Sequence, residues 1–149
     1  MPLRAGDAVA ALIVLDDGRY LMQKRDDLPA IWYPGHWGLF GGGVDAGETD
    51  VEAMARELEE EIELTVPPEA FTPFTRFVFD LTTLGDRVVY RTYFRMVLPV
   101  GILDTIHLRE GAAVAAFSAA EILGGTLPVT PYDSFALWLD FGRARLGHG

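Results

Sequence analysis

The segment from residue 49 to residue 64 constrains the fold of this chain more than any other stretch. Thr49 followed three residues later by Glu52 is typical of the capping box that starts a helix. At about 100° per residue, a helix over 50–62 gathers its apolar side chains on one stripe. The stripe consists of Val51, Met54, Ala55, Leu58 and Ile62. Such a helix must cover an apolar surface that the rest of the chain supplies.

The flanking sequence predicts a β-sheet as that surface. Apolar, β-branched and aromatic runs between turn signals predict strands at 8–15, 20–23, 74–81, 88–98 and 113–117. A short helix is expected after Ser118, and a longer one should begin with Thr130 as its N-cap and end near Arg145. The chain has 149 residues, half of them hydrophobic, which suits one domain over 1–149. We therefore expect a mixed sheet with packed helices, an α/β or α+β sandwich.

Acidic residues dominate the charge of the chain. The net charge is −10, and the stretch from Glu48 to Glu63 contains eight acids and a single base, Arg56. This balance opposes binding to a phosphate backbone, so we expect no nucleic-acid partner. No apolar run approaches the roughly 20 residues of a membrane span. The sequence lacks cysteine and shows no signal peptide, so we expect a cytoplasmic protein without membrane contact.

The acids of the predicted helix divide between two faces. The solvated back carries Glu52, Glu59 and Glu63. Glu57, Glu60 and Glu61 are spaced i, i+3 and i+4, which groups them beside the apolar stripe, at the margin of the fold. Adjacent carboxylates repel one another, and a hard divalent cation such as Mg²⁺ or Mn²⁺ relieves that repulsion. From these residues alone, a solvated acidic helix is an equally good interpretation.

The wider pattern resembles a known family. From Gly42 the order is glycine, five residues, Glu48, seven residues and then Arg56-Glu57-Leu58-x-Glu60-Glu61-x-Glu63-Leu64. This resembles the Nudix box, and eight of its nine specified positions match. The stretch 37–42 resembles the family's entry to the box, with Phe40 where proline is frequent. The resemblance implies a Nudix α/β/α sandwich with a mixed sheet. The departure is Glu63 in place of glycine, so we expect the helix to end differently, about one residue later.

The resemblance also implies roles for individual residues. Glu57, Glu60 and Glu61 would bind Mg²⁺, with Mn²⁺ as a possible substitute, and Glu48 would be a supporting ligand. Arg56 would orient a glutamate through charge-assisted hydrogen bonds. Family members often use a further acid from a later loop, for which Glu110 is the candidate. The predicted catalytic set is therefore Glu57, Glu60, Arg56 and Glu110.

Candidate substrate contacts surround the box. Arg25, at the end of a strand, is a candidate phosphate ligand, although a solvated strand end explains it too. Gly41 and Gly42 would let a loop backbone lie close to the helix and to phosphates. Trp37, with Trp32 and Tyr33, could stack a base, whereas aromatics near a loop more often close a core. Arg91 and Arg95 are on alternating positions of one strand face. They could be phosphate ligands or surface residues.

The implied activity is metal-dependent hydrolysis of a diphosphate bond in a nucleoside diphosphate linked to another moiety. Nucleotide sugars and nucleoside triphosphates both remain open as the substrate class. The alternative is a non-catalytic Nudix-fold module or regulator that binds nucleotides, although such modules would be expected to lose box carboxylates. An isomerase acting on an isopentenyl-type diphosphate ranks low, because those relatives use a cysteine. A homodimer is possible both for the hydrolase and for the binding module.

Overall fold

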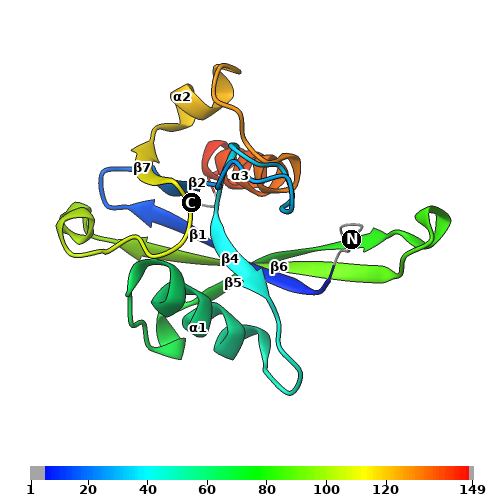
Figure 1. Ribbon diagram of the computed structural model, residues 1–149. Helices are drawn as coiled ribbons and strands as arrows, with labels where there is room; N and C mark the ends of the chain where they lie inside the picture. Colours follow the sequence, from blue (N-terminus) through cyan, green and yellow to red (C-terminus); the bar gives the residue numbers. More distant parts are fainter. Residues whose placement is uncertain (1–5, 148–149) are drawn as a thin grey trace.

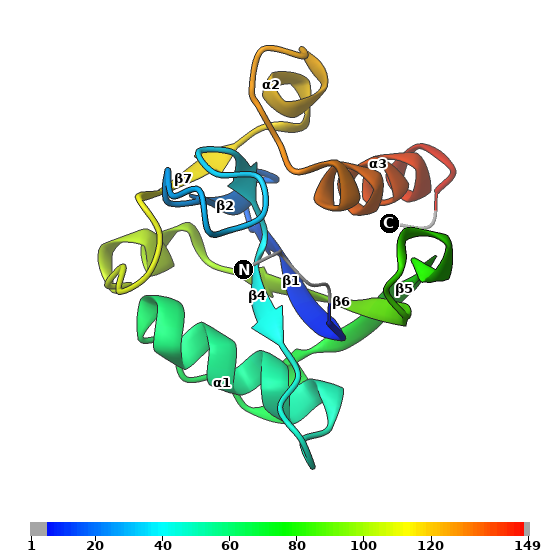
Figure 2. The same cartoon turned by 45° about the vertical axis from the view of Figure 1, so that its right-hand side comes forward.

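Residues 6–147 are described by the computed structural model, and they form one mixed β-sheet with helices on both faces (Figures 1 and 2). The strands are β1 (Ala8–Leu15), β2 (Tyr20–Lys24), β3 (Trp37–Gly38), β4 (Phe40–Gly43), β5 (Thr72–Asp80), β6 (Val88–Leu98) and β7 (Ala113–Phe117). The helices are α1 (Asp50–Ile62), α2 (Ala119–Leu123) and α3 (Pro131–Arg145). Short 3₁₀ turns lie at Pro68–Ala70, Thr82–Leu84 and Val100–Asp104. The predicted α/β sandwich with a mixed sheet is confirmed.

Strand β1 lies inside the sheet and is buried along most of its length. One edge pairs in parallel with β6, from Ala8 opposite Arg91 to Leu15 opposite Leu98. The other edge is divided, because residues 13–14 pair with β2 whereas residues 8–11 pair with β4. The sheet therefore forks along β1, and α1 packs against both β1 and β4.

Two hydrophobic cores fill the space on either side of the sheet. On the α1 side, Val9, Ala11 and Ile13 of β1 pack with the apolar stripe of α1. Met54, Leu58 and Ile62 have no exposed surface, which confirms the predicted stripe. On the α3 side, the alternate residues of β1 pack with Ala136 and Leu137. This alternation is the period of two that a strand buried on both faces produces.

Helix α1 has the predicted bounds but a different end from the one expected. The capping box is present, with the Thr49 hydroxyl accepting from the Glu52 N–H. At the other end Glu63 adopts the left-handed conformation, with φ 55° and ψ 35°. Its N–H donates to Glu59, and the N–H of Leu64 donates to Leu58, as in a glycine-capped helix. The expectation of a later end was wrong, because these bonds offset the roughly 1 kcal/mol cost of that backbone.

Two further details differ from the expectations. The glycines 41–43 belong to strand β4 and pair with β1, rather than forming a loop. Thr130 precedes α3, but its hydroxyl donates to Asp133 and accepts no capping hydrogen bond. Among the described residues, no helix is long and apolar enough to cross a membrane.

Candidate active site

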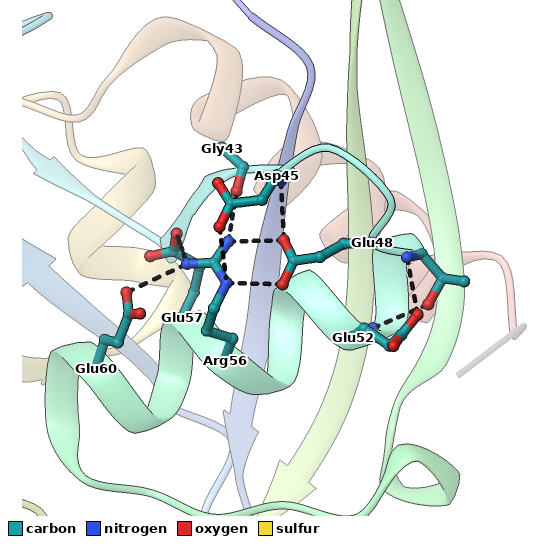
Figure 3. A network of polar contacts seen from close by, with 8 residues as sticks. Gly43, Asp45, Glu48, Glu52, Arg56, Glu57 and Glu60 are labelled. Carbon is teal, nitrogen blue, oxygen red and sulfur yellow. Dashed lines mark hydrogen bonds and ion pairs between the residues drawn. The ribbon is translucent and has the colours of Figure 1, made fainter.

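Arg56 lies at the centre of a network of acids along α1 (Figure 3). Its Nε and Nη2 donate to the two carboxylate oxygens of Glu48 at 2.7 and 2.9 Å. Its Nη1 donates to Glu57 at 3.0 Å and to Glu60 at 3.2 Å, and its Nη2 also donates to the carbonyl of Gly43 at 2.9 Å. The hydrogen bonds with Glu48 raise the pKa of Arg56 and lower that of Glu48. Arg56 thus ties the end of β4 and three of the predicted metal-binding glutamates together.

Glu57 and Glu61 are the two carboxylates of α1 that turn into the protein. Glu57 is 9% exposed and Glu61 is 2% exposed. Burial, followed by the neighbouring charge of Glu57, raises the pKa of Glu61 to about 9. Burial also raises the pKa of Glu57. The predicted position at the margin of the fold is therefore wrong for Glu61, which is almost enclosed.

The buried end of Glu61 is held by two donors from the sheet. Gln23 of β2 donates from Nε2 at 2.6 Å, and the N–H of Gly41 donates at 3.1 Å. We did not predict a role for Gln23, although a lone amide in the apolar run of β2 was a usable signal. A side chain at Gly111, where φ is +92°, would meet the Gln23 Oε1 at 2.8 Å. Glycine there lets the later loop pass close to Gln23, the partner of the buried acid.

Gly42 gives Glu57 its place under β4. A Cβ atom at Gly42 would lie 2.4 Å from Oε1 and 2.6 Å from Oε2 of Glu57. Real contacts of this kind do not occur, so the carboxylate occupies the volume that any other residue's side chain would need. The absence of a side chain at the first position of the box therefore has a direct steric reason.

Glu60 and Glu110 remain at the surface near the buried pair. The side chain of Glu60 is 50% exposed, and its ion-pair contact is with Arg56. The N–H of Arg109 donates to the Glu61 carbonyl at 2.7 Å, which anchors the loop that carries Glu110. The charge of Glu110 is one of the causes that raise the pKa of Glu61. The structure thus brings this candidate close to the buried pair. Glu59 is exposed, as expected.

A divalent cation suits the chemistry of these donors. Within residues 6–147, no three or more aspartate, glutamate or histidine side chains are grouped so as to hold a metal ion by themselves. Glu48 and Glu60 instead pair with Arg56, while Glu57 and Glu61 lie together with raised pKa values. Mg²⁺ is usually bound through one or two carboxylates, with water and substrate phosphates completing its shell. The buried pair fits an open site of that kind.

A cleft of about 470 Å³ opens on the other side of β4. The glycines 41–43 form one wall, and Arg25 and Arg91 also line the cleft. Its aromatic lining includes Trp32, Tyr33, Tyr132 and Phe135. Sequence reasoning overlooked Tyr132 and Phe135, because nothing local relates a later helix to the glycine strand. One backbone strand thus separates the buried carboxylates from an aromatic cleft.

The predicted substrate residues are not all in this cleft. Arg25 lines it and donates from Nε to the carbonyl of Trp32 at 2.6 Å, and Gly41 and Gly42 line it too. Trp37 does not line it, because its ring packs edge-on against Phe117 with 4.9 Å between centroids. The structure therefore separates Trp37 from Trp32 and Tyr33 and places it against the core on the α3 side.

Comparisons with known proteins identify relatives of this chain. The nucleoside triphosphatase NudI of Escherichia coli is 39% identical over 71 residues, which are 48% of this chain and 49% of that protein. The chain thus spans about half the length of the curated relatives it matches. A MutT NUDIX hydrolase from Burkholderia pseudomallei is 27% identical with a TM-score of 0.68, over 89% of this chain and 95% of that one. A MutT protein from Methanosarcina mazei shares the fold at 24% identity and a TM-score of 0.72, over 97% of this chain and 98% of that one.

The model of the NUDIX domain matches residues 4–135. The chain belongs to the NUDIX domain family.

Proposed function

We propose that this protein hydrolyses a phosphoanhydride bond in a nucleotide, with Mg²⁺ as cofactor and Mn²⁺ as a substitute. The substrate is a nucleoside triphosphate or a nucleoside diphosphate joined to another group. One observation carries the proposal: a buried carboxylate pair and an aromatic cleft lie on opposite sides of the glycine strand β4. When a nucleotide occupies the cleft, its phosphates can lie along the glycines of β4 and reach the carboxylates. The relative NudI is a nucleoside triphosphatase, which supports the triphosphate class.

The acids of α1 would divide the chemical work. Glu57 and Glu61 would hold the metal, with Glu60 and Glu48, which now pair with Arg56, as further ligands. The bound cation would neutralise charge that develops on the phosphate oxygens. Glu60 or Glu110, both exposed to water, would accept the proton of the attacking water molecule. The new phosphorus–oxygen bond forms as the bond to the bridging oxygen breaks. The leaving group departs as phosphate or pyrophosphate from a triphosphate, and as a phosphate monoester from a diphosphate joined to another group.

The cleft would orient the rest of the nucleotide. Arg25 has no acidic partner among the described residues, so its charge is available to a phosphate group. Tyr33 lies 5.8 Å from Tyr132 between ring centroids, and these rings offer faces on which a base can stack. Tyr33 has a φ of 47°, an uncommon value for a large side chain. Such backbones are often retained where a side chain serves a site.

A second function also has an observation in its favour. The guanidinium of Arg56 already pairs with Glu48, Glu57 and Glu60. Acids whose charges are already paired with an arginine do not need a metal ion. The same arrangement would therefore suit a module that binds nucleotides without hydrolysing them.

Hydrolysis itself separates the two functions. Nucleoside triphosphates and nucleotide sugars should be incubated with the protein and Mg²⁺, and the products identified by mass spectrometry. Turnover that requires the metal and falls strongly in Glu57→Gln supports the enzyme. Tight nucleotide binding without any phosphate release, with Mg²⁺ or Mn²⁺, would establish the binding module instead. Cytoplasmic residence and a homodimeric state stay predictions, and light scattering tests the second.

A further inference from the structure

Arg91 is clamped in a fixed orientation on the α3 face of the sheet. Its Nη2 donates to Asp133 at 3.1 Å, and its Nε donates to the Tyr93 hydroxyl at 3.0 Å. Its guanidinium carbon lies 4.7 Å from the centre of the Tyr132 ring. Asp133 is 1% exposed and also accepts from the N–H of Leu39 and the hydroxyl of Thr130. A guanidinium held from two sides has the rigidity that selective recognition requires.

One nitrogen of this guanidinium is left for a ligand. Within residues 6–147, no acceptor forms a hydrogen bond with Nη1 of Arg91. No buried side-chain nitrogen in this part of the chain lacks a partner, so Nη1 must be accessible to solvent. Arg91 lines the 470 Å³ cleft, so this accessible nitrogen belongs to a side chain that borders the space where we propose that the nucleotide binds.

The position and charge of Arg91 favour a contact with the base of the nucleotide over a contact with its phosphates. Ala8 pairs with Gly43 on one side and with Arg91 on the other, so Arg91 lies two strands from the glycine wall. Two strand spacings are about 10 Å, which leaves room for a sugar between base and phosphates. Asp133 neutralises Arg91, whereas Arg25 in the same cleft has no ion pair in the described chain. A neutralised guanidinium attracts phosphate weakly but still donates directional hydrogen bonds.

We propose that Arg91 is a specificity-determining residue whose Nη1 donates to a carbonyl oxygen on the edge of the substrate base. This inference rests on the proposed function, which makes the ligand a nucleotide. A guanidinium has donors and no acceptor. A keto base satisfies it, whereas an exocyclic amino group would bring two donors together and leave both without a partner. The cleft should therefore prefer hypoxanthine, guanine and uracil over adenine and cytosine.

Matched nucleotide pairs test the preference, because their members differ only in the keto or amino group and in the proton on the adjacent ring nitrogen. These pairs are ITP with ATP, and UTP with CTP. We expect kcat/KM to be about tenfold higher or more for the keto member of each pair. Binding should show the same preference when methylene analogues, which cannot be hydrolysed, are titrated by calorimetry. Binding is measured without turnover, so it tests Arg91 even if the proposed hydrolysis fails.

Two variants of Arg91 and one control complete the test. The side chain of Arg91→Gln can donate a hydrogen bond or accept one. Arg91→Lys keeps an ion pair with Asp133 but has no second nitrogen to donate to the base. Both should bring the keto-to-amino ratio to within about twofold of unity. Arg95→Gln is the matched control, because Arg95 pairs with buried Asp140 on the same strand face but lines a different cavity. It should keep the wild-type ratio.

The outcomes distinguish the two proposals. Equal affinities for the members of each pair in the wild-type protein would overturn the role of Arg91, as would an unchanged ratio in folded Arg91→Lys. An equal loss for all four nucleotides in that variant would assign Arg91 to a phosphate instead and would also overturn it. A keto preference in binding without any hydrolysis would uphold Arg91 while refuting the proposed function.

Discussion

Replacing Gly42 by alanine tests the steric basis of the candidate site. The new Cβ would lie 2.4 Å from Oε1 of Glu57, and ordinary contacts begin at 3.4 Å, so the carboxyl group must withdraw by about 1 Å. That movement is resisted, because Arg56 holds the same oxygen at 3.0 Å and Glu57 is buried. Overpacking of this kind costs about 1–3 kcal/mol, against less than about 1 kcal/mol gained by removing a strand glycine.

The larger effect should appear in turnover. A displacement of about 1 Å in a catalytic group can reduce the rate by roughly 100-fold, so kcat of Gly42→Ala should fall by about that factor. Steady-state kinetics and thermal unfolding measure the two effects separately. Gly142→Ala is the control, because its added Cβ would meet no atom within 4 Å apart from the adjacent backbone of its own helix, and it should keep wild-type kcat. Wild-type turnover in Gly42→Ala, or a crystal structure of it with Glu57 undisplaced, would refute the steric argument.

Three further predictions concern the acids of α1. Glu60→Gln should lower kcat by about two to four orders of magnitude while Glu59→Gln changes it little, and equal small losses in both would contradict a role for Glu60. Mg²⁺ or Mn²⁺ should raise the melting temperature, because a cation that binds only the folded state stabilises it; calorimetry that detects no binding, with or without a phosphate ligand, would contradict this. Without metal, the folded state keeps a proton on Glu61 between its ordinary pKa of 4.5 and its raised pKa of about 9, so stability should fall as pH rises through that window. Denaturant titrations should show this slope in the wild-type protein and a smaller one in Glu61→Gln; equal slopes would contradict the assignment.

The features that sequence predicted well depend on neighbours along the chain. Helix α1 could be predicted because its cap, its stripe and its solvated back are set by residues within four positions of one another. Glu63 shows where local reasoning fails even at short range. Its left-handed backbone is unfavourable in isolation, but two hydrogen bonds at the helix end stabilise it.

The features that could not be predicted depend on residues far apart in the sequence. Glu61 is nearly enclosed because Gln23, which is 38 positions earlier, reaches its carboxylate. Asp133 accepts from the N–H of Leu39 across 94 positions, and this contact helps to fix the floor of the cleft. Helical spacing gives the angular position of a side chain but not what covers it. Trp37 is a similar case, since its partner Phe117 lies in a distant strand.

The forked edge of β1 has a consequence for how such a protein can diversify. Residues 8–11 fix the register of β4, and with it the contact between Gly42 and Glu57. Residues 26–36, which carry Trp32 and Tyr33, are inserted between β2 and β3, and the pairing of Lys24 with Trp37 closes that insertion. Insertions or deletions there would reshape the cleft without shifting the register on which the acids depend. The part of the cleft wall that this insertion supplies can thus change independently of the buried acids within one small domain.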